Sequence, residues 1–223
     1  ISVGGGNVSI AADVTSVAGT SAWGVTASTS GTAAITSNKV TTTGADGVAI
    51  YGRGDSGVAI ASGDVTTSGA RGHGIQAVAT SGSITIDSTG AVAVSGGGAA
   101  GVQARSGSGA IDVAVNAVTA TGGGASAVDL ASSGGGNIAL DVSGEVSVAG
   151  AGQFAGALLN NTGDLAVTMG ATGSLTGSGS GLVAQRGALV LDNAGTIRGN
   201  GTRASLSAVP EAGVRVQSSA VIQ

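Results

Sequence analysis

The chain has 223 residues, of which 44 are Gly, one is Pro and none is Cys; 42% are hydrophobic, although Phe, Trp and Tyr occur once each. A net charge of -4 without acidic or basic runs excludes the electrostatic footprint of a nucleic-acid-binding protein. The lack of Cys excludes a disulfide framework and a thiolate metal site, and a mean hydropathy of +0.42 argues against disorder.

Each predicted turn of the chain opens with a short strand in which apolar and polar residues alternate. The pattern is clearest at residues 8–10, 84–86, 111–113, 138–140 and 165–167. Its apolar positions recur every 24 to 27 residues and form one aliphatic column: Ile10, Ile35, Ile60, Ile86, Val113, Leu140, Val167 and Leu191. Recurrence at a nearly fixed period is typical of a solenoid, and this column predicts about eight turns, or rungs.

Two further strands are predicted in each rung, separated by turns that contain Gly. The second strand begins near a valine in most rungs: Val14, Val40, Val65, Val92, Val118 and Val146. The third begins after a Gly or Ala, at Val25, Val48, Ile75, Val102, Val128, Leu182 and Val214. Because side chains alternate in and out along a strand, we expect the recurring aliphatic residues to point inward and stack on their equivalents in the next rung.

The sequence therefore predicts an all-β fold, a right-handed parallel β-helix with about eight three-strand rungs of 24–27 residues, forming a single domain over residues 1–223. An antiparallel sandwich also accommodates short strands and frequent Gly, but it needs no constant period. Near the end of the chain the turn is longer and contains Pro210 and Glu211, so we expect a protruding loop over residues 200–212. Neither end carries a capping pattern, and we expect the chain to be a segment of a longer repeat array.

Two stretches, residues 65–77 and 189–201, combine a short alternating strand with a Gly-rich corner. In this they resemble the rungs of passenger domains of bacterial autotransporters, and the resemblance extends over essentially the whole chain. It implies a secreted β-helical stalk or adhesin on the bacterial surface, associated with virulence. It also implies anchoring in the outer membrane through a C-terminal barrel outside this chain. The resemblance carries over no catalytic residue.

The sharpest short motif is the Arg53-Gly54-Asp55 tripeptide, the sequence that integrins recognise. We expect it in a turn after Tyr51, where it is a candidate cell-binding site, although three residues in a Gly-rich chain carry little information. Four further residues at predicted corners are candidate loop contacts: Arg71, His73, Pro210 and Glu211.

Catalytic chemistry has little support in the sequence. His73 is the only imidazole, and we expect it in a solvated corner rather than in an acid–base pair. Four acidic residues fall in or just after first strands, in registers that differ by our alignment: Asp87, Asp112, Asp141 and Asp192. We interpret them as solvated strand ends, and we predict no enzyme activity, no cofactor and no required metal.

Two outward surfaces are also predicted. The second strands carry hydroxyl-bearing or small residues at alternate positions, which would form a flat ladder like that of ice-binding solenoids: Thr41/Thr43, Thr66/Ser68, Ala93/Ser95, Thr119/Thr121, Ser147/Ala149 and Ser174/Thr176. The third strands end near Arg53, Arg105 and Arg186, which could form a sparse basic stripe for anionic glycans.

The sequence favours a non-catalytic stalk that displays binding loops to a host-cell receptor, extracellular matrix or a glycan. It predicts no nucleic-acid partner, and contact with a membrane only through the barrel that the resemblance implies. The alternatives are a polysaccharide-acting β-helix enzyme, an ice-binding solenoid, and a self-associating solenoid whose flat, weakly charged faces pair.

Overall fold

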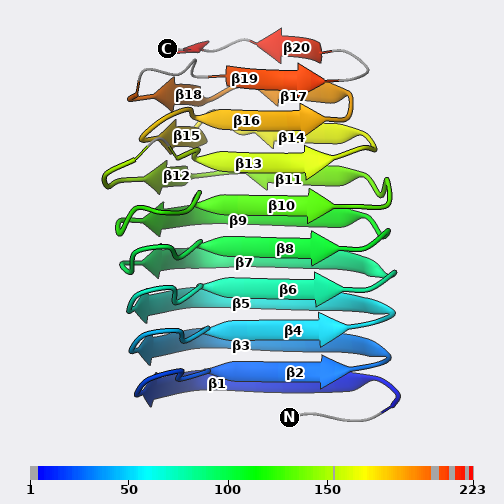
Figure 1. The fold of residues 1–223 in the computed structure, drawn as a ribbon, viewed down its shortest axis with the longest axis vertical. Helices are drawn as coiled ribbons and strands as arrows, with labels where there is room; N and C mark the ends of the chain where they lie inside the picture. The colour runs from blue at the N-terminus through cyan, green and yellow to red at the C-terminus, as the bar shows by residue number, and fades with distance from the viewer. Residues whose placement is uncertain (1–4, 153, 202–205, 211–213, 219–220, 223) are drawn as a thin grey trace.

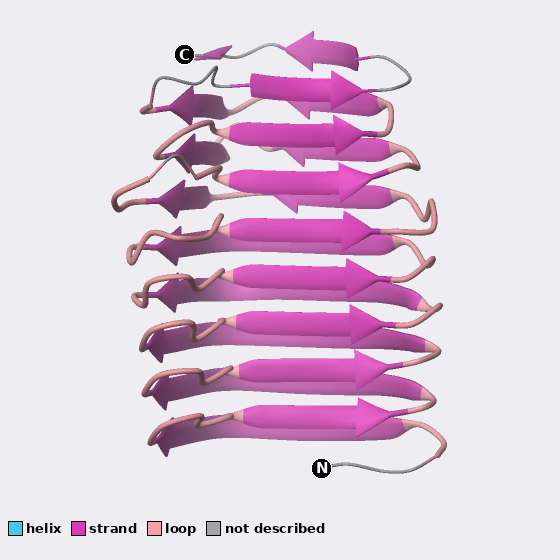
Figure 2. Ribbon diagram, in the orientation of Figure 1, coloured by secondary structure: helices cyan, strands magenta, loops and turns pink. Residues whose placement is uncertain are grey.

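The computed structural model describes residues 5–152, 154–201, 206–210, 214–218 and 221–222. Over these residues the chain is an all-β solenoid in which parallel strands stack along one axis, with the N-terminal turns at one end and the C-terminal turns at the other (Figure 1). Strands and loops make up the described part of the chain (Figure 2). It includes no helix long and apolar enough to cross a membrane.

Two parallel sheets form the walls of the solenoid. The first has 13 strands among the described residues. Its main path is β1 (Val8–Ala18), β3 (Thr32–Thr43), β5 (Gly57–Ser68), β7 (Ser83–Val94), β9 (Ile111–Ala120), β11 (Ile138–Val142), β14 (Leu165–Met169), β17 (Leu189–Asn193) and β20 (Val214–Ser218). A branch continues it from β9 through β12 (Glu145–Val148), β15 (Ser174–Gly177), β18 (Thr196–Gly199) and β21 (Val221–Ile222).

In the part of the chain that the structure describes, the second sheet has 8 strands and faces the first across the interior. In stacking order they are β2 (Val25–Thr29), β4 (Ile50–Gly54), β6 (Ile75–Ala79), β8 (Val102–Ser106), β10 (Val128–Ser132), β13 (Ala157–Asn161), β16 (Leu182–Arg186) and β19 (Leu206–Pro210). Each strand pairs with its equivalents in the neighbouring turns, so the main-chain hydrogen bonds run along the axis of the solenoid.

The aliphatic column predicted from the sequence is confirmed. Ile10 pairs in register with Ile35, and the same pairing continues turn by turn to Val167 and Leu191. From Ile35 onward each member of the column is at most 2% exposed. The strands alternate between buried and more exposed positions, as a half-buried pleated strand requires.

The interior is narrow, which accounts for the scarcity of aromatic residues. From β2 to β8 the central inward column of the second sheet consists of Ala and Gly: Ala27, Gly52, Ala77 and Ala104. A Cβ atom added at Gly52 would lie 2.7 Å from Cγ1 of Val58, and one added at Gly101 would lie 2.2 Å from Cγ1 of Val118. Small residues at these positions let the two walls approach at close-packed density.

The prediction of three separate strands in every rung holds only for the later turns. In β1, β3, β5, β7 and β9 the first and second predicted strands are one continuous strand that bends midway. The bend has nearly the same length in these turns, so the hydrogen-bonded ladder continues through it, with register shifts after Ser62 and Ser88. Beyond β9 the residues before and after the bend form two separate strands in each turn, as in Ile138–Val142 and Glu145–Val148.

Two strand starts were predicted wrongly. Val25 pairs with Ile50, so β4 begins at Ile50 and not at Val48. Thr15, and not Val14, is the residue paired with Val40. In both places two apolar positions lie close together, and only the pairing distinguishes them.

The last predicted third strand is also wrong. Val214 belongs to β20 in the first sheet, where it pairs with Leu189. The strand of the second sheet in that turn is Leu206–Pro210, which pairs with Leu182–Arg186. The expected loop over 200–212 is therefore incorrect for residues 206–210, because they continue the wall of the solenoid. Residues 202–205 and 211–212 lie outside the described part, and Glu211 with them.

Candidate functional site

The Arg-Gly-Asp motif lies at the end of a strand of the second sheet. Arg53 and Gly54 are the last residues of β4, and Asp55 begins the turn that follows. The Arg53 side chain is exposed, but the Asp55 carboxylate is bonded within the solenoid: Thr80 Oγ1 donates a hydrogen bond to Asp55 Oδ1 at 2.7 Å. The backbone carbonyl of Asp55 accepts from the Ser81 amide at 3.1 Å. The motif is thus part of the wall and is held by the next turn.

The corner predicted around Arg71 carries an ion pair between successive turns. Arg71 has a φ of 59°, in the left-handed region, and its guanidinium binds both carboxylate oxygens of Asp46, with Nε–Oδ1 at 2.5 Å and Nη2–Oδ2 at 2.9 Å. The hydrogen bonds and charge of Arg71 hold the pKa of Asp46 below its ordinary value, and Asp46 raises the pKa of Arg71. Both side chains are solvated, so the pair orients the corner and contributes little to stability.

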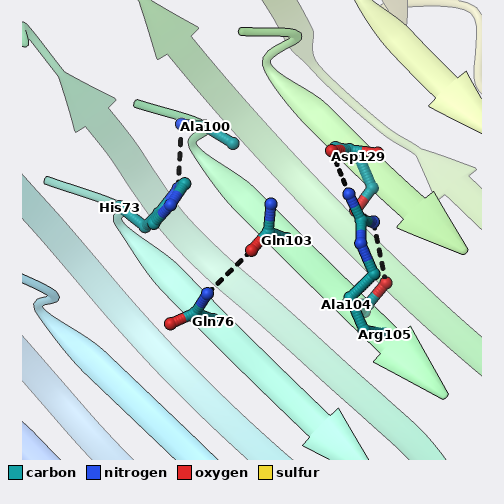
Figure 3. A network of polar contacts seen from close by, with 7 residues as sticks. All are labelled: His73, Gln76, Ala100, Gln103, Ala104, Arg105 and Asp129. Carbon is teal, nitrogen blue, oxygen red and sulfur yellow. Dashed lines mark hydrogen bonds and ion pairs between the residues drawn. The ribbon is translucent and has the colours of Figure 1, made fainter. Parts of the chain in front are cut away.

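His73 lies half-buried on the same corner and does not extend into solvent as expected. Its Nδ1 atom accepts a hydrogen bond from the Ala100 amide at 3.1 Å, which places His73 against the next turn (Figure 3). Burial lowers the pKa of His73, and the nearby charge of Arg105 also lowers it, whereas the charge of Asp129 acts in the opposite direction. The imidazole therefore serves as a neutral acceptor between turns.

The outward face of the second sheet carries a column of planar polar side chains. Tyr51, Gln76, Gln103 and Asp129 occupy one outward column in successive strands from β4 to β10. Trp23, just before β2, packs edge-to-face on Tyr51 with ring centroids 4.8 Å apart and an interplanar angle of 71°. We call Trp23, Tyr51, Arg53, Gln76 and Gln103 the aromatic–amide face.

Hydrogen bonds link this face from turn to turn. Gln76 Nε2 donates to Gln103 Oε1 at 2.7 Å, and Arg105 binds the carboxylate and, at 3.0 Å, the carbonyl oxygen of Asp129 (Figure 3). Arg53 and Arg105 share the neighbouring outward column, whereas Arg186 lies one position further along its strand. Since Asp129 neutralises Arg105, the predicted basic stripe is reduced on this part of the face to Arg53.

A shallow groove of about 500 Å³ runs along the bend of the first sheet. Asp87 and Asp141 line it with Thr89, Asn116 and other small residues. The expectation of differing registers is wrong for three of the four acidic residues. Asp87, Asp141 and Asp192 each lie one residue after a member of the aliphatic column and share one outward column, with Ala114 and Thr168 between them. Only Asp112 lies in a different column. No group of three or more His, Asp or Glu in the described residues could hold a metal ion.

The hydroxyl ladder forms on the second segment of the first sheet. Its register is confirmed for the column Thr41, Thr66, Ala93, Thr119 and Ser147. In the next turn Thr176 continues this column and Ser174 pairs with Glu145, two residues from the predicted partner Ser147. The alanine and the glutamate interrupt a regular hydroxyl lattice.

The aromatic–amide face is the feature that sequence reasoning missed. Trp23 and Tyr51 are 28 residues apart and neither fits the aliphatic columns, so the repeat alone did not bring them together. Their position in the repeat was the signal that could have found them: Trp23 lies two residues before a third strand, and Tyr51 is the second residue of the next third strand.

Pro210, a predicted loop contact, is instead the last residue of β19, and its side chain lies outside the described part of the chain.

A comparison with family models, curated proteins and solved structures finds no match to this chain.

Proposed function

We propose that the chain is a non-catalytic, secreted stalk of the bacterial cell surface that presents adhesive surfaces on its side walls. The observation that supports this function best is the unbroken aliphatic column from Ile10 to Leu191, which makes the described turns one continuous rod. Its outward positions are mainly small and weakly charged, so binding depends on the few places where larger polar side chains gather.

A finer description of the fold belongs to the same proposal. We take the solenoid to be a right-handed parallel β-helix of about eight rungs, because crossover connections between parallel strands are right-handed in about 98% of cases. Each rung adds about 4.8 Å along the axis, so the number of rungs sets the reach of the stalk. Rigidity follows from the hydrogen bonds, which run along the axis of extension.

A solenoid built of stacked turns is suited to secretion in the manner of an autotransporter. Each turn of a solenoid contacts only its neighbours, so folding can begin at one end and proceed as the chain emerges from a membrane. The chain has no Cys, so no disulfide has to form outside the cell. The anchor would be a barrel in the same polypeptide, and the partner a host-cell receptor, matrix protein or glycan.

The test removes one turn. Deleting residues 111–137 joins Ala110 to Ile138, which occupies the same register as Ile111. We expect this variant to keep its β-sheet circular dichroism and to shorten by about 5 Å in small-angle scattering. As the control, deleting residues 111–123 removes β9 without replacing its register, so the columns on either side no longer match and the protein should unfold.

Adhesion is tested with the same variants. Each is displayed on bacteria through a fused outer-membrane barrel, and attachment to epithelial cells, matrix proteins and immobilised glycans is counted. The full chain and the one-turn deletion should attach, and the control should not. If the folded, displayed chain attaches to none of these surfaces, the adhesive function is wrong.

A polysaccharide-acting enzyme is the second candidate, favoured by the shared column of Asp87 and Asp141 in the groove. Two inter-strand spacings separate them by roughly 9.6 Å, close to the upper range for inverting glycosidases. Both side chains are exposed, however, whereas a general acid is normally shielded so that it keeps its proton. Release of reducing ends from polysaccharides, lost in Asp141→Asn, would favour this candidate over the stalk.

A further inference from the structure

The aromatic–amide face contains the largest exposed side chain of the described residues. Trp23 is 42% exposed and rests on Tyr51 rather than in the interior. An edge-to-face pair stabilises the two turns it joins, but it also leaves aromatic surface in contact with water. Two of the three aromatic residues of the chain thus meet at one outward position.

The glutamines continue this surface along the axis. Their mutual hydrogen bond uses an amide donor of Gln76 and the carbonyl of Gln103, so the carbonyl of Gln76 and the amide group of Gln103 point away from the bond (Figure 3). These groups can accept from and donate to hydroxyl groups of a ligand. Tyr51, Gln76 and Gln103 follow one another at the inter-strand spacing of about 4.8 Å, so the surface suits an extended molecule lying along the solenoid.

Charge decides which extended molecule fits. Arg53 lies two residues after Tyr51 on the same outward side of β4, and its side chain is exposed. Within the described residues it belongs to no ion pair, in contrast to Arg71 and Arg105. A guanidinium in this position can bind a carboxylate or sulfate with two hydrogen bonds.

We propose that the aromatic–amide face binds an acidic polysaccharide. The sugar rings lie against Trp23 and Tyr51, their hydroxyl groups bond to Gln76 and Gln103, and an anionic group of the polymer binds Arg53. The proposal rests on the adhesive function above and names the class of ligand for one wall. Nucleic acid fits less well, because phosphate recognition depends on several cations and this face offers one unpaired arginine.

The sole tryptophan of the chain reports binding directly. The intact chain is titrated with polygalacturonate, which carries carboxylates, with heparin, which also carries sulfates, and with neutral dextran, and the fluorescence of Trp23 is recorded. We expect saturable changes with at least one acidic polymer, weakened by salt, and none with dextran. Saturation by both acidic polymers identifies either anion as sufficient, and saturation by heparin alone identifies sulfate as the required group.

Substitutions on the face separate this site from the rest of the molecule. Arg53→Gln should weaken binding roughly tenfold, the effect expected for the loss of a charge-assisted contact. Arg198→Gln removes an exposed arginine from the first sheet, loses the same charge and should leave binding unchanged. Gln103→Ala should weaken binding without altering the charge, and circular dichroism verifies that each variant is folded.

The result that overturns the proposal is the absence of binding to any acidic polymer, or equal weakening by Arg53→Gln and Arg198→Gln. Such a result leaves the adhesive stalk intact if displayed bacteria still attach to cells. Asp55→Asn tests the Arg-Gly-Asp motif separately: it should reduce integrin-dependent attachment if the motif is functional, and it should not affect polysaccharide binding.

Discussion

Val167→Ala tests whether the inward column carries the stability of the solenoid. Val167 is 1% exposed and pairs with Leu140 on one side and Leu191 on the other. Removing two buried methyl groups loses about 0.8 kcal/mol each, or about 1.6 kcal/mol in transfer free energy. The cavity left between the neighbouring turns raises the expected loss to about 2–3 kcal/mol.

Val190→Ala is the matched control. Val190 lies in the strand next to that of Val167, but its side chain points outward and is 48% exposed. Its substitution by Ala removes the same two methyl groups and lowers the β-propensity by the same amount. Its substitution should cost less than about 0.5 kcal/mol. Urea denaturation followed by far-UV circular dichroism measures both. Equal losses in the free energy of unfolding would refute the assignment of the inward column as the core.

Two further predictions concern single residues. His73 should titrate below its ordinary pKa of 6.5 in a nuclear magnetic resonance experiment, and because the unfolded chain then binds more protons, stability should fall as the pH drops below 6.5; His73→Gln should remove this part of the pH dependence. Gly96→Ala should destabilise by more than about 1 kcal/mol in thermal or urea unfolding, since its Cβ would lie 1.6 Å from a backbone oxygen of the preceding turn. Gly5→Ala, which meets only a serine hydroxyl at 4.0 Å, should cost less. An ordinary pKa for His73 or equal effects of the two glycine substitutions would contradict these statements.

The first strands were predictable because their signal repeats. Ile35, Ile60 and Ile86 are large, β-branched and nearly equally spaced, and burial in one narrow core requires that regularity. The second sheet has a weaker signal, since Ala27, Gly52 and Ala77 fill its central inward column and resemble turn residues in the sequence. The repeat period could nevertheless have located the missed strand Leu206–Pro210, because Leu206 lies 24 residues after Leu182, within the spacing of the other columns.

Outward registers could not be predicted to the same accuracy, for a physical reason. A small insertion at a bend leaves the inward columns aligned, because the ladder absorbs it as a register shift, such as that after Ser88. An alignment by residue count then misplaces the residues beyond the bend. This is why Ser174 was aligned with Ser147 although it pairs with Glu145.

The position of the aromatic pair follows from the same constraint that defines the core. A Cβ atom added at Gly52 or Gly101 would already clash with a valine side chain of the opposite wall. The interior therefore has no room for an indole or phenol ring. Trp23 and Tyr51 are consequently held outside, where they add nothing to the column that supports the fold. Substituting them should therefore affect ligand binding more than folding, which is what distinguishes a binding surface from a structural cluster on this wall.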